Sequence, residues 1–326
     1  MSAPLSEHQS AASPDAPPFI SVIINCYNSA RFLEEALESV RAQTYADWEL
    51  VFWDNQSTDE SAAIFKRYDD PRFHYFYAPE HTFLGKAKTV AIEKARGEWL
   101  AFLDCDDLWL PHKLEQQVAL IQEGGADLGL VYGRMEVLVE DEARETSVAK
   151  SALAASLASR HKPLPEGEVF EPLLAENFVP QPSVILRRDV YWSVGGVNPA
   201  FKHSWDYDLF LRVSKGWKLR ALQEVCCKYR VHGTNLTHTQ KEIGYQESIA
   251  MMSNFLPDPA AARAIRVYES IYAGYEIYSG HLFAGLTRLV KRGSLTIFAH
   301  KFFNFFWRGF LARIQTASTR SSRISK

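Results

Sequence analysis

The sequence predicts an α/β fold, in which helices flank a mixed β-sheet, followed by a helical, basic extension. Short apolar runs alternate with segments of helical spacing through the first hundred residues. Such alternation is typical of parallel strands joined by right-handed helical crossovers. Helical spacing also fills the part from residue 243 to the end, where Lys and Arg accumulate. With 326 residues, 47% of them hydrophobic, the chain is long enough for one large domain with an appendage.

The elements follow one another in a regular order. Four apolar runs predict strands, at residues 19–24, 48–53, 73–77 and 99–103. Helical spacing predicts helices at 30–44, around 64–65 and at 86–95. Strand-like runs return at 183–186 and 219–225, after a stretch from 140 to 167 that we interpret as a helix or loop insertion. The predicted sheet is therefore Rossmann-like, although the first turn lacks the GxGxxG motif of dinucleotide-binding dehydrogenases.

The N-terminal segment and the cysteines bear on the location of the protein. Residues 1–18 are polar and rich in Ser, Ala and Pro, which predicts a disordered tail and no signal peptide. The four cysteines show neither CxxC pairs nor metal-site spacing, which favours a reducing cytosol. No uninterrupted apolar run approaches the roughly 18 residues of a membrane span. We therefore expect a cytoplasmic protein.

The C-terminal end differs in charge from the rest. Residues 281–326 contain nine Lys or Arg and no acidic residue, so this segment has a formal charge of +9. Because the whole chain has a formal net charge of −3, residues 1–280 have a formal charge of −12. Between Leu295 and Ile314, seven aromatic residues face a narrow polar stripe. This pattern favours an interfacial helix on anionic lipid, at the inner face of the cell membrane. The alternative is a helix that packs on the domain. Nucleic acid is disfavoured, because the body is acidic and carries no recognition motif.

Three carboxylates follow the fourth predicted strand, at Asp104, Asp106 and Asp107. This edge of an open α/β sheet is where ligands bind. Crowded carboxylates need a cation, and oxygen ligands favour Mg²⁺ or Mn²⁺. A solvated turn that caps the next helix is the alternative.

Several motifs occur in order between residues 19 and 237. They comprise SVIINCYN at 21–28, ESVRAQTY at 38–45, DNQSTD at 54–59, ARGEW at 95–99 before DCDD at 104–107, SVILRR at 183–188, VGG at 194–196, WDYDLFLR at 205–212 and YRVHG at 229–233. Together they resemble the family 2 glycosyltransferases. The resemblance implies an A-type glycosyltransferase fold that spans residues 19–240, with residues 241–326 as the helical extension. It also implies inverting transfer of a sugar from a nucleotide diphosphate sugar, with a UDP-sugar favoured, to a hydroxyl of a glycan or lipid-linked acceptor.

The resemblance also implies roles for single residues. Asp106 would hold Mn²⁺ or Mg²⁺, His232 would reach the metal or the diphosphate, and Asp104 would contact the donor ribose or the metal. The residues implied at the donor are Asn25, Tyr27, Asp54, Asn55 and Lys88. The alternatives are an Asx-turn for Asp54, a core aromatic for Tyr27, and an exposed helix lysine for Lys88. Asn25 and Asn55 depart from the family pattern, so the identity of the nucleobase in the donor stays open.

The general base of inverting transfer is implied at Asp206. The family usually has Glu before this Asp, and here Trp205 stands in its place. For Asp107 and Asp208 we expect structural roles at helix caps.

Two other functions remain open on the sequence. A sugar nucleotidyltransferase would need a Gly-rich, basic loop after the first strand, which residues 25–29 do not offer. A non-catalytic nucleotide-sugar or glycan-binding protein is disfavoured by the retained Asp104, Asp106 and Asp206, and favoured by Trp205.

Overall fold

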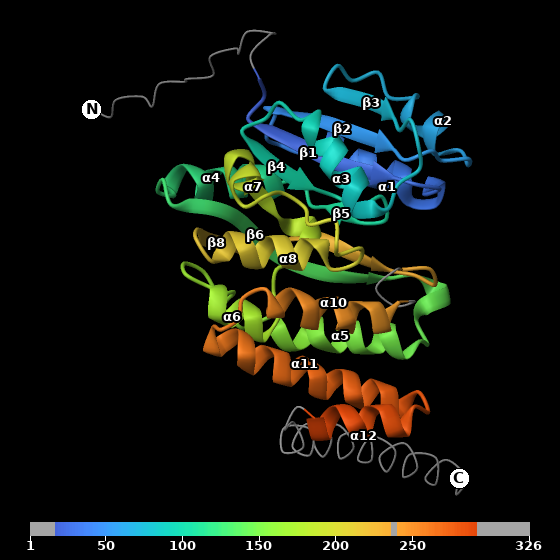
Figure 1. Ribbon diagram of the computed structural model, residues 1–326. Coiled ribbons are helices and arrows are strands. Elements are labelled where there is room, and N and C mark those ends of the chain that lie inside the picture. Colours follow the sequence, from blue (N-terminus) through green and yellow to red (C-terminus); the bar gives the residue numbers. More distant parts are fainter. Residues whose placement is uncertain (1–16, 236–239, 292–326) are drawn as a thin grey trace, which may run out of the picture.

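A computed structural model describes residues 17–235 and 240–291 of the chain. One eight-stranded sheet runs through the molecule in the order β3-β2-β1-β4-β7-β6-β8-β5, and helices cover both of its faces (Figure 1). The predicted mixed α/β sheet with flanking helices is thus confirmed.

The first half contains the predicted alternation of strands and helices. Its elements are β1 (Ile20–Cys26), α1 (Ala30–Arg41), β2 (Trp48–Asp54), α2 (Ser61–Phe65), β3 (Phe73–Tyr77), α3 (Leu84–Glu93) and β4 (Trp99–Phe102). β1 pairs in parallel with β2 and β4, and β2 pairs in parallel with β3. Every residue of β1, β2 and β4 is buried, because helices cover both faces. Four parallel strands therefore end at one common edge.

The second half makes the sheet mixed. Its elements are β5 (Leu108–Trp109), α4 (Lys113–Glu123), β6 (Leu128–Val139), η1 (Asp141–Ala143), α5 (Ser147–Ser159), α6 (Phe170–Ala175), η2 (Gln181–Ser183), β7 (Ile185–Arg187), α7 (Arg188–Ser193), α8 (Trp205–Ser214) and β8 (Lys218–Val231). β7 lies antiparallel between β4 and β6, β6 pairs in parallel with β8, and β5 pairs antiparallel with β8. The 140–167 insertion contains the helix α5.

A polar network joins three strands at their amino ends. The Ser21 hydroxyl donates to Glu49 Oε1 (2.7 Å) and accepts from the backbone N–H of Gly97 (2.8 Å). The backbone N–H of Arg96 donates to the same Glu49 oxygen (2.7 Å). A Cβ atom at position 97 would lie 2.5 Å from the backbone nitrogen of Ser21, so only glycine fits. This network fixes the start of β4 against β1 and β2.

Three further helices follow, α10 (Lys241–Ser253), α11 (Pro259–Tyr278) and α12 (Leu282–Lys291). Arg288 holds α12 on α11 through Glu269 (2.9 Å) and Glu276 (3.0 Å). No helix in the described part of the chain is both long and apolar enough to cross a membrane. The predicted tail up to residue 16 and the predicted amphipathic segment 295–314 lie outside the described residues.

Candidate active site at the carboxyl edge of the parallel strands

Three neighbouring parallel strands end side by side, and polar residues follow each of them. β1 and β2 end in register at Cys26 and Asp54, while Phe102 at the end of β4 lies opposite Ile23. The acidic cluster Asp104, Asp106 and Asp107 follows β4 directly. The sheet edge thus brings together the polar segments that the sequence predicted at a binding site.

Lys88 neutralises the first carboxylate of the acidic cluster. Its side chain is fully buried on α3, and its ammonium donates to Asp104 Oδ1 at 2.8 Å. The ammonium also lies 5.4 Å from the ring centroid of Trp205, which in turn packs edge-on against Phe102. Lys88 is therefore not the exposed helix lysine that the sequence left as an alternative. Trp205, at the position of the expected Glu, completes an aromatic wall around the cation.

His232 contacts the second carboxylate. Its Nε2 lies 3.0 Å from Asp106 Oδ2, and its Nδ1 lies 3.0 Å from the Thr234 hydroxyl. The imidazole packs against the Phe32 ring, with the centroids 5.1 Å apart. Two residues separated by 126 positions in the sequence, both predicted as metal ligands, are thus neighbours in the fold.

Arg230 stabilises the backbone of the acidic cluster, a role that the sequence did not reveal. Its Nε donates to the backbone oxygen of Asp106 (2.8 Å), and its Nη2 donates to Glu35 (2.8 Å). A third nitrogen, Nη1, donates to Glu140. The side chain is only 4% exposed, so these contacts replace its hydration. Its place in the YRVHG motif was the available signal.

Asp107 has a structural role different from the predicted helix cap. Its Oδ1 accepts from the backbone N–H of Arg230 at 2.9 Å, which ties the cluster to β8. The next helix, α4, has His112 at its N-cap position and no side-chain cap, so the predicted cap is wrong. Burial, together with the charges of Asp106 and Asp104, raises the pKa of Asp107 well above its usual range.

At the end of β2, the side chains of two residues that the sequence predicted to bind the sugar donor form hydrogen bonds within the protein. Asp54 Oδ1 accepts from the backbone N–H of Ser57 (2.7 Å), and Oδ2 accepts from the Tyr75 hydroxyl (2.6 Å). These contacts match the turn interpretation that the sequence left open. The Asn55 amide donates to the Thr82 carbonyl (2.6 Å) and accepts from its N–H (3.1 Å). Asn55 therefore fixes the loop that follows β3.

Beside them lie residues at the end of β1 and directly after it. Tyr27 is 50% exposed, and its ring centroid lies 4.2 Å from that of His81. Tyr27 is thus not a core aromatic. His81 also contacts the Asn55 carbonyl at 2.9 Å, and nothing in the sequence marked it, because its place depends on a loop. The Asn25 amide is 9% exposed, and neither of its polar atoms has a hydrogen-bond partner.

Asp206 occupies the first turn of α8, close to the acidic cluster. Burial raises its pKa to about 6, and the negative charge of Asp104 adds to that shift. Such a carboxyl group titrates nearer to neutrality than an ordinary aspartate, which suits an acid–base catalyst.

Asp208 does not cap this helix. It is the fourth residue of α8, whose N-cap position is Ser204. Its carboxylate forms an ion pair with Arg212 one turn later, at 2.6 Å. Arg212 also donates to the carbonyl of Val194 (2.5 Å), so the pair joins α8 to the end of α7. The predicted cap is wrong, because the i, i+4 pairing determines the role of this residue.

The types of ligand atom around the acidic cluster, carboxylate oxygen and imidazole nitrogen, suit a divalent cation such as Mn²⁺. Asp106 and His232 present carboxylate oxygen and imidazole nitrogen at one point, a set that suits Mn²⁺. Within residues 17–235 and 240–291, no three His, Cys, Asp or Glu side chains are assembled around one position. Magnesium-type sites commonly use one or two carboxylates and take their remaining ligands from substrate phosphates and water. The residues therefore fit such an ion only with a phosphate-bearing substrate.

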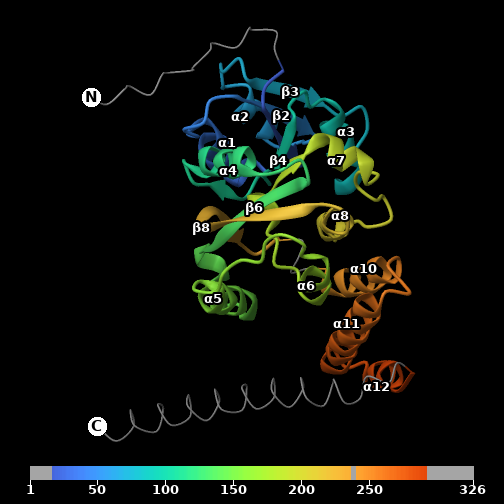
Figure 2. The same ribbon diagram turned by 90° about the vertical axis from the view of Figure 1, so that its left-hand side faces the viewer.

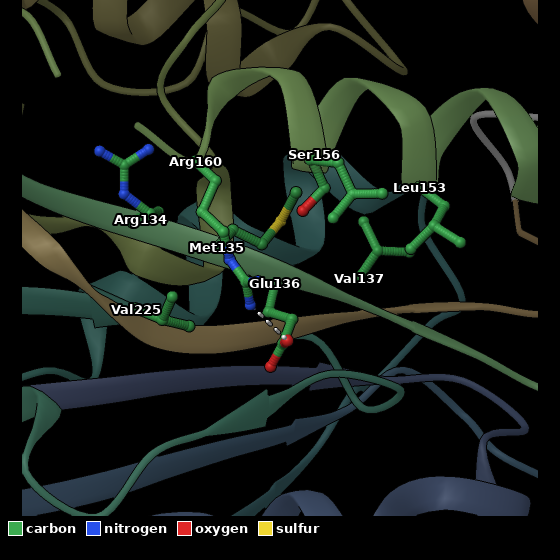
Figure 3. Close-up of a pocket in the computed structure, with 9 residues that line it drawn as sticks. Arg134, Met135, Glu136, Val137, Leu153, Ser156, Arg160 and Val225 are labelled. Carbon is green, nitrogen blue, oxygen red and sulfur yellow. Dashed lines mark ion pairs between the residues drawn. The ribbon is translucent and has the colours of Figure 1, made fainter. Parts of the chain in front are cut away.

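A separate hollow lies between β6 and α5 (Figure 3). Met135, Val137 and Leu153 line it, together with the ion pair between Arg160 and Glu136 at 3.6 Å. Its interior of about 50 Å³ has room for one or two water molecules. None of the predicted site residues lines it, so we do not assign a substrate to it.

Comparison with known proteins decides the family. The family model described as "Glycosyl transferase family 2" matches residues 21–195. The chain belongs to this family. Its members transfer sugars, so the chain is a glycosyltransferase rather than a nucleotidyltransferase or a non-catalytic binding module.

Curated relatives agree with this assignment. The enzyme UDP-Glc:alpha-D-GlcNAc-diphosphoundecaprenol beta-1,3-glucosyltransferase WfgD of Escherichia coli is 26% identical over 74% of this chain and 88% of its own length. An uncharacterised glycosyltransferase of Nostoc is 30% identical over 73% of this chain and 74% of its own length.

Solved structures share the fold. TarS of S. aureus in complex with UDP-GlcNAc has a TM-score of 0.55 at 17% identity, over 78% of this chain and 71% of that one. The mannosyltransferase PcManGT of Pyrobaculum calidifontis, in complex with GDP-Man and Mn²⁺, also has a TM-score of 0.55 at 17% identity, over 98% of this chain and 91% of that one. The predicted A-type glycosyltransferase fold is confirmed.

Proposed function

We propose that the protein is an inverting, metal-assisted glycosyltransferase, with Asp206 as its general base. The observation that carries this proposal is the place of Asp206 in the first turn of α8, beside Asp104 at the sheet edge, where desolvation raises the pKa of its carboxyl group to about 6. An inverting transfer needs one base that removes the proton of the acceptor hydroxyl while its oxygen attacks the anomeric carbon. A carboxylate with this pKa is deprotonated at neutral pH and is a stronger base than an ordinary aspartate.

The proposed donor is a nucleotide diphosphate sugar, with a UDP-sugar favoured. The E. coli relative uses UDP-Glc by its name, and TarS holds UDP-GlcNAc. The nucleobase of this donor would lie near Tyr27, Asp54 and Asn55, and its diphosphate near Asp104 and Asp106. Tyr27 is half exposed, so its ring can stack against the nucleobase while it keeps its contact with His81.

Reaction chemistry follows from the same residues. A divalent cation held by Asp106 and His232 would neutralise the charge that develops on the leaving diphosphate. Lys88 contributes a buried positive charge through Asp104, at 2.8 Å. Asp206 accepts the acceptor proton as the new glycosidic bond forms and the bond between the sugar and the diphosphate breaks. Arg230 fixes the backbone on which Asp106 is carried.

The first experiment separates donor binding from chemistry. Thermal shifts with UDP, UDP-Glc, UDP-GlcNAc, GDP and GDP-Man, each with and without Mn²⁺, identify the donor, because a ligand that binds the native state stabilises it. With that donor, Asp206→Asn should lower kcat by about 10²- to 10⁴-fold and leave donor affinity nearly unchanged. Asp106→Ala should abolish metal-dependent turnover.

Controls and pH dependence sharpen this test. Asp189→Asn, at a 70% exposed position of α7, should keep full activity. Turnover of the wild type should fall with acidity at or below about pH 6, as Asp206 takes up a proton. Unchanged turnover in Asp206→Asn would remove this residue as the base.

For the acceptor we propose a glycan or a lipid-linked sugar, with the enzyme on the anionic inner face of the cell membrane. The E. coli relative acts on a diphosphoundecaprenol-linked sugar by its name. In this chain, α12 exposes Phe283 (85%) and Val290 (66%). These apolar residues belong to the region 281–326, which carries nine basic and no acidic residues. An apolar face next to basic residues suits an anionic bilayer surface.

Vesicle sedimentation tests the membrane proposal. The full chain should pellet with phosphatidylglycerol vesicles and much less with phosphatidylcholine vesicles. Phe283→Glu combined with Val290→Glu should reduce the bound fraction several-fold, since each adds a charge that must stay in water. Leu157→Glu, at a 56% exposed position of α5, is the matched control. Equal pelleting of all three proteins would exclude α12 as the contact surface.

A further inference from the structure

Two buried amide side chains have no hydrogen-bond partner at either polar atom. Asn25 is 9% exposed and Gln181 is 8% exposed. For each of them, the amide nitrogen and the carbonyl oxygen are both unpaired. Across residues 17–235 and 240–291, these are the two Asn or Gln side chains with this property. Burying an amide without partners is costly, so such groups usually mark an absent ligand or water.

Both amides flank the acidic cluster, on opposite sides. On the β1 side, the parallel register that pairs Ile23 with Phe102 brings Asn25 beside Asp104, and the Cys105 thiol donates to the Asn25 carbonyl at 3.3 Å. On the other side, the Trp109 indole, two residues after Asp107, donates to the carbonyl of Pro182, the residue that follows Gln181, at 2.7 Å. The short helix η2, which begins at Gln181, contacts β4, β5, β6 and β8.

The order of the strands matches the order of groups in a nucleotide sugar. A donor of this kind is linear, with a nucleoside, a diphosphate and a sugar. If the nucleoside lies at the ends of β2 and β1 and the diphosphate at the end of β4, then the sugar extends toward η2. This step rests on the proposed function. The group at that place is Gln181, which is neutral and offers one acceptor and two donors.

We propose that Gln181 binds a hydroxyl group of the donor sugar and determines which sugars the enzyme accepts. A hydroxyl both donates and accepts a hydrogen bond, as does a primary amide, so the two groups match. A sugar that lacks this hydroxyl cannot pair the buried amide, so it should bind more weakly than a sugar that has the hydroxyl. Asn25, on the nucleotide side of the cluster, contacts the nucleotide part of the donor instead.

The proposal predicts opposite effects on stability and on binding. Gln181→Met keeps the shape of the side chain and removes an unpaired buried amide, so the melting temperature of the free protein should stay equal or rise. Affinity for the sugar nucleotide should fall about tenfold, as a neutral hydrogen bond is lost and its partner hydroxyl is left unpaired. Affinity for the matching nucleoside diphosphate should not change.

A matched control lies just after α1. Gln43 is also buried, but its amide donates to the carbonyls of Ser39 (3.0 Å) and Leu110 (2.9 Å), and its oxygen accepts from the backbone N–H of Leu114 (3.0 Å). Gln43→Met should therefore lower the melting temperature and leave both affinities unchanged. Gln181→Leu serves as a second variant, so that the result does not depend on one replacement.

Calorimetric titration in the presence of Mn²⁺ measures the affinity of the wild type and of each variant for two ligands. These are the sugar nucleotide that gives the largest shift in the thermal-shift panel and its nucleoside diphosphate. A loss confined to the sugar nucleotide supports the proposal. An equal loss for both ligands, or no loss for either, overturns it while the proposed function stands. If no nucleotide of the panel binds the wild type, the proposed function fails, and this proposal fails with it.

Discussion

Two fully buried lysines lie on opposite faces of the sheet, and their surroundings differ in one respect. Lys88 on α3 has its ammonium 5.4 Å from the ring centroid of Trp205, and Lys113 on α4 has its ammonium 4.1 Å from that of Trp109. Each therefore has an indole as a neighbour. Lys88 donates to the carboxylate of Asp104, whereas Lys113 donates to the neutral amide of Gln117. The helices that carry them cover different faces (Figure 2).

The difference shows what separates a functional buried charge from a structural one. Burial lowers the pKa of Lys113 to about 8, because its partner is neutral and cannot stabilise the ammonium. Lys88 instead has an anion at 2.8 Å, and this anion is 38% exposed at the sheet edge. A buried ion pair that reaches solvent through its acid is available to a charged ligand. A lysine with an amide partner on the far face is not.

The largest expected effect comes from removing the charge on the functional face. Lys88→Met should lower kcat/KM by about 10²-fold or more, because Asp104 loses its counter-ion and repels the donor diphosphate. Lys88→Arg should retain more activity, since it keeps the charge. Steady-state kinetics with the identified donor measure both. An equal loss of activity in Lys113→Met would contradict the comparison.

A smaller effect, on stability alone, is expected on the other face. The unfolded chain keeps the Lys113 proton up to pH 10.5, while the folded chain loses it near pH 8. Between these values the unfolded state binds more protons, so the stability that Lys113 contributes rises with pH. Relative to Lys113→Met, the wild type should gain about 2 kcal/mol of unfolding free energy from pH 8 to 9.5. Chemical denaturation at the two pH values measures this, and a flat difference would show that Lys113 is charged throughout.

The smallest effect concerns the indole beside Lys88. Trp205→Phe keeps an aromatic face but a weaker one, and cation–π pairs contribute roughly 0.5 to 1 kcal/mol. We expect kcat/KM to fall by about two- to fivefold, without a change in the metal requirement. Loss of activity as complete as in Lys88→Met would mean that Trp205 contacts the substrate itself.

The sequence predicted the strand ends better than the contacts around them. The run before Asp104 is apolar and ends in carboxylates, so its place at the sheet edge follows from local pattern. The partners of Lys88 could not be predicted, because they depend on how α3 packs against β4 and α8. Asp208 was misassigned for a related reason: an acid near a helix start resembles a cap until the first helical residue is known. Nothing in the local sequence distinguished the unpaired Gln181 from the paired Gln117.

The network at the amino edge suggests how this enzyme can be redesigned. Ser21, Glu49 and Gly97 hold β1, β2 and β4 in register from the end opposite the acidic cluster. The loops at the carboxyl edge therefore do not have to maintain the register of these strands. Laboratory selection for a new sugar should accumulate changes in η2 and in the segment after β4, where we propose that the sugar binds. Position 97 should remain glycine throughout, since any side chain there collides with the backbone of Ser21.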